Sequence, residues 1–296
     1  MALAGLANNR SPSYTISDPG FFNLPGSRHQ YRDWKKGGHG SVDMFKSIVI
    51  SCDTYYYGLA TELGIDDIHE YLEQFGFGKK TGLDMEGESS GLLPSADWKR
   101  RRYNQIWYPG DTVSVGIGQG YTLVTPMQLA YATAVLANDG IGHRPHLVKQ
   151  NVQDGGDSDN TRSLASINLE IKPEHLDLVK RAMTAVTLPG GTAAFAGSGA
   201  SYAFAGKTGT AQVIGIKQGE TYKEKEIDER HRDHAWFIAF APADKPRIAL
   251  AVLAENAGHG GSVSAPIARK VIDYYLLGKV PQTMLDAKIK MEAEHD

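Results

Sequence analysis

The hydrophobic pattern follows a helical repeat along most of the chain and changes to three strand-like runs near its end. Apolar residues recur at helical spacing in five segments, which we therefore predict to be helices: 42–63, 66–76, 126–137, 172–186 and 266–277. Three shorter apolar and aromatic stretches are predicted to be strands: 202–213, 235–241 and 247–254. The intervening segments 8–43 and 79–112 are rich in turn-forming residues and are predicted to be loops.

Local signals refine this pattern at two places. Thr125, Pro126 and Gln128 have the spacing of a capping box with proline at the first helical position, so a helix is expected to begin at 126. Both faces of the strand 235–241 are apolar, which indicates helices on each side of the sheet. Because the helices gather before the strands, an α+β domain is favoured over a doubly wound one.

Composition and charge narrow the class of protein. The chain has 296 residues, 41% of them hydrophobic and 22% charged, and we predict a single domain over 1–296 with a frayed polar tail at 279–296. A net charge of −3 offers no surface for a polyanion, so nucleic acid is not an expected partner. No apolar run reaches the roughly 18 residues that a membrane span needs, and the single Cys52 excludes an internal disulfide.

Lys207-Thr208-Gly209, inside the first predicted strand, is the strongest candidate for chemistry. On a strand that faces a cleft, an ammonium and the hydroxyls of Thr208 and Thr210 can hold a substrate carboxylate, and Gly209 lets the substrate lie flat against the backbone. The triplet accompanies Ser-x-x-Lys and a second serine motif in β-lactamases and penicillin-binding proteins. Ser51-Cys52-Asp53 supplies a serine that could relay a proton beside a carboxylate.

With these motifs, the chain resembles the C-terminal transpeptidase domain of class B penicillin-binding proteins, of the elongation type called penicillin-binding protein 2. The aspartate of Ser51-x-Asp53 and the stretch Arg32-Asp33-Trp34 point to the elongation branch, since the division branch usually carries Ser-x-Asn. The resemblance runs from about residue 14 to 278. Its other stretches are Asp18-Pro19-Gly20, Gly38-His39-Gly40, Gly116-Ile117-Gly118-Gln119-Gly120, Thr125-Pro126, 207–213 and Arg232-Asp233-His234.

The resemblance implies a fold and residue roles. The fold is an α+β transpeptidase domain of the penicillin-binding and β-lactamase-like type, with an antiparallel sheet covered by helices on both faces. Ser51 resembles the proton-relay serine with Asp53 as its partner, and Lys207 resembles the strand lysine that supports this relay and attracts the substrate carboxylate. Thr208 and Thr210 would bind the terminal D-Ala carboxylate, and the backbone N–H of Thr210 would form half of an oxyanion hole.

One motif of the family is missing from these residues. No serine in the 296 residues has a lysine three positions later; Ser41, Ser47 and Ser95 do not. The family places Ser-x-x-Lys at the start of a helix whose end resembles residues 1–7, where the lysine takes the proton of the nucleophile. We therefore expect a chain cut inside the domain or missing upstream sequence, and no covalent turnover by these residues alone.

A second group of residues has metal-binding chemistry. Asp18, Asp33, His39 and Cys52 could complete a tetrahedral zinc site beside Ser51, although turn-forming aspartates and a buried cysteine would explain the same residues without a metal. The resemblance favours a structural zinc that ties the loop 18–40 to the catalytic edge. No organic cofactor is expected.

The function that the resemblance implies is peptidoglycan cross-linking in cell elongation. A D-Ala-D-Ala stem peptide would be the donor substrate, and β-lactams would acylate the enzyme. The implied location is the periplasmic face of the inner membrane, with a SEDS-type glycosyltransferase and rod-shape proteins as partners. A serine β-lactamase or penicillin sensor, and a non-catalytic interaction module, remain alternatives.

Two further stretches are open to more than one interpretation. Gly116-x-Gly118-x-Gly120 lacks the strand–turn–helix context of a nucleotide-binding loop and is predicted to shape a turn at the cleft. The charged segment 214–234 is either a solvated loop or a lid over the Lys207 strand, whose far end Asp233-His234 would anchor.

Overall fold

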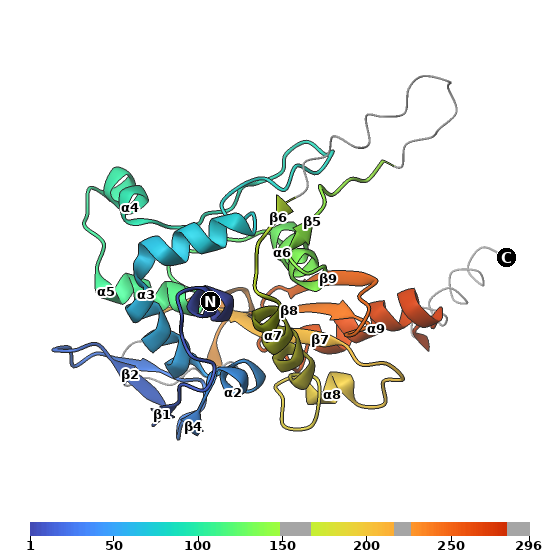
Figure 1. Ribbon diagram of the computed structural model, residues 1–296, viewed down its shortest axis with the longest axis horizontal. Coiled ribbons are helices and arrows are strands. Elements are labelled where there is room, and N and C mark those ends of the chain that lie inside the picture. Colours follow the sequence, from blue (N-terminus) through green and yellow to red (C-terminus); the bar gives the residue numbers. More distant parts are fainter. Residues whose placement is uncertain (149–166, 216–225, 283–296) are drawn as a thin grey trace.

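The computed structural model describes residues 1–148, 167–215 and 226–282, and at its centre lies an antiparallel sheet (Figure 1). Its strands are β7 (Ala205–Ala211), β8 (His234–Ala241) and β9 (Ile248–Ala254), in the order β7-β8-β9. Lys207 lies opposite Ile238, and Gly209 lies opposite Trp236. The three predicted strands are therefore confirmed, although β7 is shorter at both ends than the predicted 202–213.

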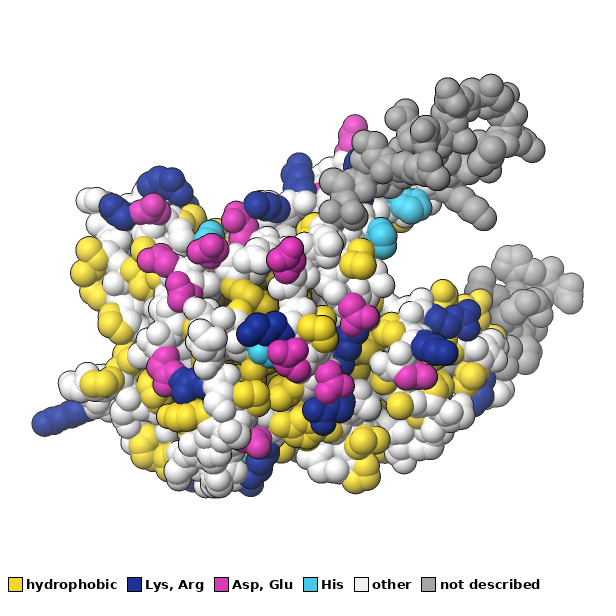
Figure 2. Space-filling model, viewed as in Figure 1, with side chains coloured by type: hydrophobic (Ala, Val, Ile, Leu, Met, Phe, Trp, Pro, Cys, Tyr) yellow, Lys and Arg dark blue, Asp and Glu magenta, His cyan; other side chains and the backbone are white. Residues whose placement is uncertain are grey.

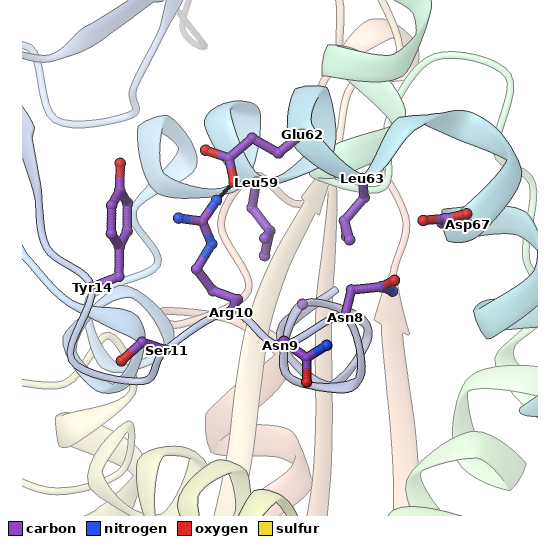
Figure 3. Close-up of a pocket in the computed structure, with 10 residues that line it drawn as sticks. Asn8, Asn9, Arg10, Ser11, Tyr14, Leu59, Glu62, Leu63 and Asp67 are labelled. Carbon is purple, nitrogen blue, oxygen red and sulfur yellow. Dashed lines mark ion pairs between the residues drawn. The ribbon is translucent and has the colours of Figure 1, made fainter.

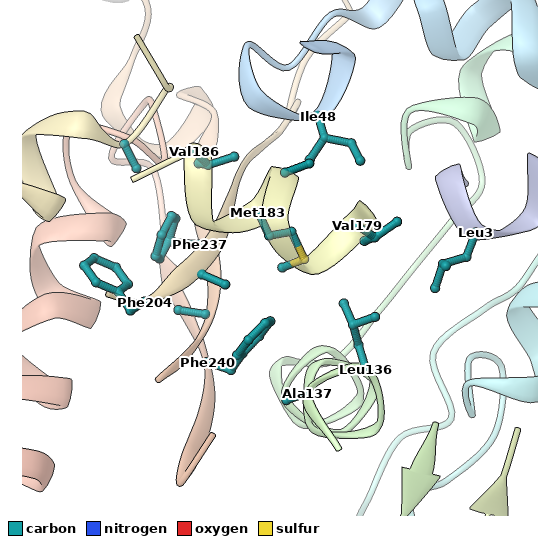
Figure 4. Close-up of a cluster of buried hydrophobic side chains, with 14 of the residues drawn as sticks. Leu3, Ile48, Leu136, Ala137, Val179, Met183, Val186, Phe204, Phe237 and Phe240 are labelled. Carbon is teal, nitrogen blue, oxygen red and sulfur yellow. The ribbon is translucent and has the colours of Figure 1, made fainter. Parts of the chain in front are cut away.

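Helices cover both faces of this sheet. Alternate side chains of a strand point to opposite faces, and both Phe237 and Phe240 of β8 are fully buried. Phe240 points toward Leu136 and Ala137 (Figure 4). The helices that pack against the sheet are α6 (Pro126–Ala137), α7 (Pro173–Ala185) and α9 (Ser264–Leu277). The expected antiparallel sheet with helices on both faces is thus present, and β8 is apolar on each face because each face is part of the core.

The predicted helix over 42–63 is wrong in one respect that matters for the site. The structure has two helices there, α2 (Met44–Val49) and α3 (Asp53–Gln74), with a break between them. Ser51 lies in the break with a φ of 56°, a left-handed conformation that ends a helix. Apolar spacing continues through the break because the residues on both sides face the same core, so the pattern alone could not locate it.

The predicted boundary between the helices 42–63 and 66–76 is present inside α3. Gly64, with φ 78° and ψ 166°, has a non-helical backbone, so two helical runs meet there at a kink. A glycine reaches this conformation at little cost, whereas a residue with a side chain rarely does.

The segments predicted as loops contain short elements. Between 8 and 43 two small antiparallel sheets form, each from strands of three residues, which are too short to show a period of two: β1 (Ile16–Asp18) with β4 (Gly40–Val42), and β2 (Phe21–Asn23) with β3 (Gln30–Arg32). Residues 79–112 include α4 (Ala96–Tyr103) and the beginning of α5 (Pro109–Gly116). Helix α4 is strongly polar and has no apolar face for a pattern to detect, although Ser95 caps it by accepting from the Trp98 N–H.

Other helix boundaries follow their predicted caps. In α6 the Thr125 hydroxyl accepts from the Gln128 N–H and the Gln128 amide accepts from the Thr125 N–H, which confirms the capping box.

The remaining elements are short: α1 (Ala2–Ala7), β5 (Ile141–Gly142), β6 (Ile167–Asn168), α8 (Ala194–Gly197) and the 3₁₀ turn Glu229–His231.

Surface and chain ends add little to this picture. Basic and acidic side chains are interspersed on the face in Figure 2, in keeping with the small net charge. Among the described helices, none combines the length and the apolar character of a bilayer span. Most of the tail 279–296, predicted to fray, lies outside the described residues.

Candidate active site

The outer edge of β7 carries the residues of the Lys207-Thr208-Gly209 motif. On this edge the Gln119 amide donates to the Thr210 carbonyl at 2.6 Å, and the Lys207 ammonium donates to the Thr208 carbonyl at 2.8 Å. In an antiparallel strand the N–H and C=O of one residue point to the same side. The N–H groups of Thr208 and Thr210 therefore also face away from β8, on the side of the strand where the Gln119 amide lies.

Ser51 and Lys207, which are 156 positions apart in sequence, meet at this edge. The Lys207 Nζ donates to the Ser51 Oγ at 2.7 Å. The break between α2 and α3 places Ser51 there, since its left-handed backbone turns the chain out of the helix. Burial lowers the pKa of Lys207 to about 8, although the negative charge of Asp53 opposes this shift. The ammonium therefore stays charged below about pH 8 but releases its proton more readily than an exposed lysine, which suits a group that takes part in a proton relay.

Asp53 lies in the first turn of α3, behind the Ser51–Lys207 pair. Its Oδ2 accepts from the Trp34 N–H at 3.2 Å. Burial and the nearby charge of Asp33 raise the pKa of Asp53 to about 7, while Lys207 and the Trp34 N–H oppose them. The structure thus brings Asp53 close to Lys207 electrostatically, but its described hydrogen bond points to the loop 18–40.

Several residues around β7 belong to no motif that would identify them from the sequence. Thr192, in the turn after α7, has its hydroxyl 2.9 Å from that of Thr208. The sequence identifies Gln119 only as part of a glycine-rich turn. Its two neighbours Gly118 and Gly120 both have positive φ, which confirms the turn and directs the amide to β7. A threonine or glutamine in a loop gives no sequence signal of its own, because its role arises only from what the fold places beside it.

Gly209 is packed more closely than the sequence indicated. A Cβ built on Gly260, in the turn before α9, would lie 2.6 Å from the Gly209 carbonyl oxygen and 2.0 Å from that of Trp236. Another backbone segment therefore crosses β7 and β8 at this point. Gly209 itself has room for a Cβ only 3.3 Å from the Trp236 Cβ, so its lack of a side chain serves the packing as well as any ligand.

The four predicted metal ligands come together. One ligand atom of each of Asp18, Asp33, His39 and Cys52 lies within 4.8 Å of the others. The His39 Nδ1 is 2.8 Å from the Asp18 Oδ2 and 3.4 Å from the Asp33 Oδ1, and the Cys52 thiol donates to the Asp18 Oδ2 at 3.5 Å. The pairing of β1 with β4 brings Asp18 close to His39, and the start of α3 adds Cys52.

The chemistry of this cluster suits a divalent cation. Asp18, Asp33 and Cys52 are buried, and burial together with the two neighbouring carboxylates raises the pKa of the Cys52 thiol. A single imidazole can share only one proton on its Nδ1 between the two carboxylates. The two buried carboxylates therefore call for further positive charge, and two oxygens, one nitrogen and one sulfur form a donor set that zinc accepts.

A cavity and a charged segment are separate from these two groups of residues. A cavity of about 380 Å³ lies between the turn after α1 and α3, where Arg10 pairs with Glu62, and its lining includes none of the predicted site residues (Figure 3). In the charged segment 214–234, the Asp233 carboxylate accepts from the Val213 N–H at 3.3 Å and the His234 Nδ1 accepts from the Asn256 N–H at 2.9 Å. The far end is thus held to the residues that follow β7 and β9. Residues 216–225, which would form the loop or the lid, lie outside the described part.

Comparisons with known proteins agree with this geometry. Residues 1–273 match the family described as the penicillin binding protein transpeptidase domain. The peptidoglycan D,D-transpeptidase MrdA of Acinetobacter baumannii is 48% identical over 267 residues, which cover 88% of this chain and 38% of that protein. The chain spans about two fifths of the length of the curated relatives it matches.

Solved structures show the same fold. The structure of Pseudomonas aeruginosa PBP2 in complex with WCK 5153 has a TM-score of 0.80 at 43% identity, over 93% of this chain and 59% of that one. Helicobacter pylori PBP2 in complex with MreC has a TM-score of 0.79 at 32% identity, over 94% of this chain and 48% of that one. The expected fold class is therefore confirmed.

Proposed function

The chain belongs to the penicillin-binding protein transpeptidase family, and from this membership we propose that it forms the carboxylate-binding and proton-relay side of a peptidoglycan D,D-transpeptidase site. The observation that carries the proposal is the 2.7 Å contact between the Lys207 Nζ and the Ser51 Oγ. The two motifs are distant in sequence, and a hydroxyl beside a partly desolvated ammonium is the arrangement that a proton relay needs.

The outer edge of β7 receives the donor peptide in this proposal. A D-Ala-D-Ala stem peptide lies along the strand, with its terminal carboxylate on the hydroxyls of Thr208 and Thr210 and near the Lys207 ammonium. The Thr210 N–H, which faces this edge, donates to the oxygen of the carbonyl under attack. A β-lactam carries a matching carboxylate and occupies the same edge. Ser51 passes the proton that the leaving amine requires.

Acyl transfer also needs a nucleophile and a base that these residues do not contain. None of the serines in the chain is followed by lysine at the third position. We therefore propose that these 296 residues by themselves form no covalent adduct with a penicillin.

Labelling with a fluorescent penicillin tests the function. The 296-residue chain alone should give no covalent band, whereas the protein encoded by the complete reading frame that contains it should be labelled. In that protein Ser51→Ala should slow acylation by at least about 100-fold, while Ser41→Ala, an exposed serine of β4, serves as the matched control. Unchanged labelling of Ser51→Ala would refute the relay, and rapid release of hydrolysed product would favour a β-lactamase.

We further propose that Asp18, Asp33, His39 and Cys52 hold a structural zinc ion. A zinc ion would neutralise the buried carboxylates and keep Cys52 as a thiolate, and it would join the loop 18–40 to the start of α3. Because all four side chains converge on one point, the proposed ion is structural, and no step of acyl transfer passes through it. Metal analysis of the purified protein tests this, and less than about a tenth of an equivalent of zinc would exclude it.

Location and partners extend the same proposal. The whole protein would act at the periplasmic face of the inner membrane. A similar protein from Helicobacter pylori was solved in complex with MreC, which supports a rod-shape protein as a partner here, and a SEDS-type glycosyltransferase is the second expected partner. Co-purification of the whole protein with each candidate, compared with an unrelated membrane protein, tests both.

A further inference from the structure

Thr192 lies where three segments of the site meet. Its hydroxyl is 2.9 Å from that of Thr208 on β7, and its N–H donates to the Val49 carbonyl at the end of α2, two residues before Ser51. A Cβ on Gly261 would lie 2.4 Å from the Thr192 carbonyl oxygen and 3.4 Å from the Thr208 Cγ2. Backbone contacts therefore hold Thr192 on two sides, so its hydroxyl has a defined position relative to Thr208.

The number of protons on the two hydroxyls determines what Thr208 can do. A threonine hydroxyl donates one hydrogen and accepts at its lone pairs, and a carboxylate only accepts. If Thr208 donated its hydrogen to Thr192, it could offer a carboxylate nothing but lone pairs. Thr208 can donate to a carboxylate while keeping its contact with Thr192 only if Thr192 is the donor of that pair.

We propose that Thr192 is a positioning residue for substrate recognition, which donates to the Thr208 Oγ1 and thereby directs the Thr208 hydrogen to the ligand carboxylate. The inference rests on the proposed function, since it takes Thr208 as a carboxylate-binding group. It gives the turn after α7 a part in specificity: Thr192 favours a ligand with a free carboxylate over the same ligand with a neutral amide. Two hydroxyls in series also strengthen one another, because a hydroxyl that accepts is a better donor.

Hydrogen bonds at both ends of the segment 187–193 support this role. The Thr187 hydroxyl donates to the Phe204 carbonyl at 2.9 Å, and the Ala193 N–H donates to the Val186 carbonyl at 2.9 Å. The turn is thus tied to the end of α7 and to the residue before β7, one on each side of Thr192. A rigid turn keeps the donor in place without a contact between Thr192 and the ligand.

Equilibrium binding tests the proposal without any covalent step, so the 296-residue chain can be used. Ligand-observed NMR would measure the dissociation constants of an N-acylated D-Ala-D-Ala peptide and of the same peptide with a C-terminal amide. We expect the wild-type chain to prefer the acid, and Thr192→Val to lose roughly fivefold of that preference. Thr192→Ser, which keeps the hydroxyl, should stay within about twofold of the wild type.

Thr184→Val is the matched control, since it removes a threonine hydroxyl that donates within α7, to the Lys180 carbonyl, and takes no part in holding Thr192. It should leave the preference for the acid unchanged. The inference is overturned if Thr192→Val keeps the full preference, if it weakens the acid and the amide equally, or if Thr184→Val loses the preference as well. If the wild-type chain does not prefer the acid, the proposed function fails instead, so the two failures are distinguishable.

Discussion

Two groups of polar residues meet at residues 51–53, and their hydrogen-bonding and ligand atoms face in opposite directions. Along the outer edge of β7 the N–H groups of Thr208 and Thr210 face away from the sheet, beside the Lys207–Ser51 pair. Around Asp18 and His39 the ligand atoms all face inward, within 4.8 Å of one another. A site that turns its donors outward has capacity for a ligand that comes and goes, whereas a closed set of donors suits an ion that stays.

Three consecutive residues serve these two groups because the backbone changes direction at each of them. The backbone of Ser51 has a left-handed conformation, and its hydroxyl accepts from Lys207. The backbone of Cys52 is extended immediately before α3, and its thiol donates to Asp18. Asp53 opens the helix with its carboxylate between the two groups, where it accepts from the Trp34 N–H. A substitution in one group should therefore also affect the other through residues 51–53, and substitutions at single positions can separate the two effects.

Loss of the proposed zinc ion should have the largest effect. Cys52→Ser nearly keeps the size of the side chain but removes the thiolate ligand. Without this ligand the zinc ion should be lost, and the two carboxylates then lack the positive charge that the ion supplies. We expect zinc content to fall to trace levels and the melting temperature to drop by roughly 5–10 °C, because the binding energy of a structural ion is also folding energy. Metal analysis and scanning calorimetry measure the two quantities.

A chelator provides the control for this change. It should lower the melting temperature of the wild type by a similar amount and leave Cys52→Ser unaffected, since the variant has no ion to lose. Equal melting temperatures of the wild type and the variant, with zinc absent from both, would show that the inward-facing group is held by hydrogen bonds alone.

Lys207→Met should raise the melting temperature, whereas Cys52→Ser lowers it. Burial lowers the pKa of Lys207 to about 8, so below pH 8 the folded protein holds a charge that the unfolded chain hydrates better. Methionine removes this cost, and we expect the melting temperature at pH 7 to rise by about 2–4 °C, or roughly 1–2 kcal/mol, after allowing for the lost contact with Ser51. The buried ammonium that the site needs would thus lower the free energy of unfolding.

The pH dependence of this difference gives a sharper measurement. Between pH 8 and the ordinary lysine pKa of about 10.5 the unfolded chain binds more protons than the folded one. Stability of the wild type relative to Lys207→Met should therefore rise with pH across that window, and the gap in melting temperature should close. Lys180→Met is the control, because the Lys180 ammonium donates to the Asp139 carboxylate and the Ala137 carbonyl. A gap that stayed constant with pH would mean that Lys207 is not desolvated.

How far the sequence predicts the fold depends on whether an element shows its period over enough residues. Strand β8 and helix α6 were predicted closely, since the first is apolar on both faces and the second has a complete capping box. Helix α4, with its polar surface, and the three-residue strands of the loop 18–40 give no periodic signal. The break at Ser51 was missed because a single left-handed residue leaves the apolar spacing on either side intact.

The site was predictable where a motif fixes residue types at short spacing, and only there. Lys207 and Ser51 could be named from two triplets, and the fold brings them to 2.7 Å. Thr192 and Gln119 could not be named, because each contributes one polar group from a turn, and only the folded backbone determines which strand that group meets. Residues that act on a ligand come with sequence context, whereas residues that position them are found by contact.

Trp34→Phe should have the smallest effect, and it tests how the two groups are joined. The Trp34 side chain is 61% exposed, yet its Nε1 donates to the Ile50 carbonyl at 3.1 Å and its ring lies 5.3 Å from that of His39. Phenylalanine keeps a ring beside His39 and loses only the hydrogen bond to the turn that carries Ser51. We expect zinc content to be unchanged and the melting temperature to fall by about 2 °C or less, as for one partly exposed hydrogen bond.

Hydrogen exchange gives the more informative result for this variant. Amide exchange at residues 50–53 should quicken in Trp34→Phe, because the turn has lost one of its anchors, while exchange in β8 stays as in the wild type. Trp107→Phe is the matched control, since it removes an indole bond to the Thr112 hydroxyl in α5. If Trp34→Phe instead released zinc, the ring contact with His39 would depend on the position of the indole, and the inward-facing group would be less independent of the β7 edge than its closed set of ligands implies.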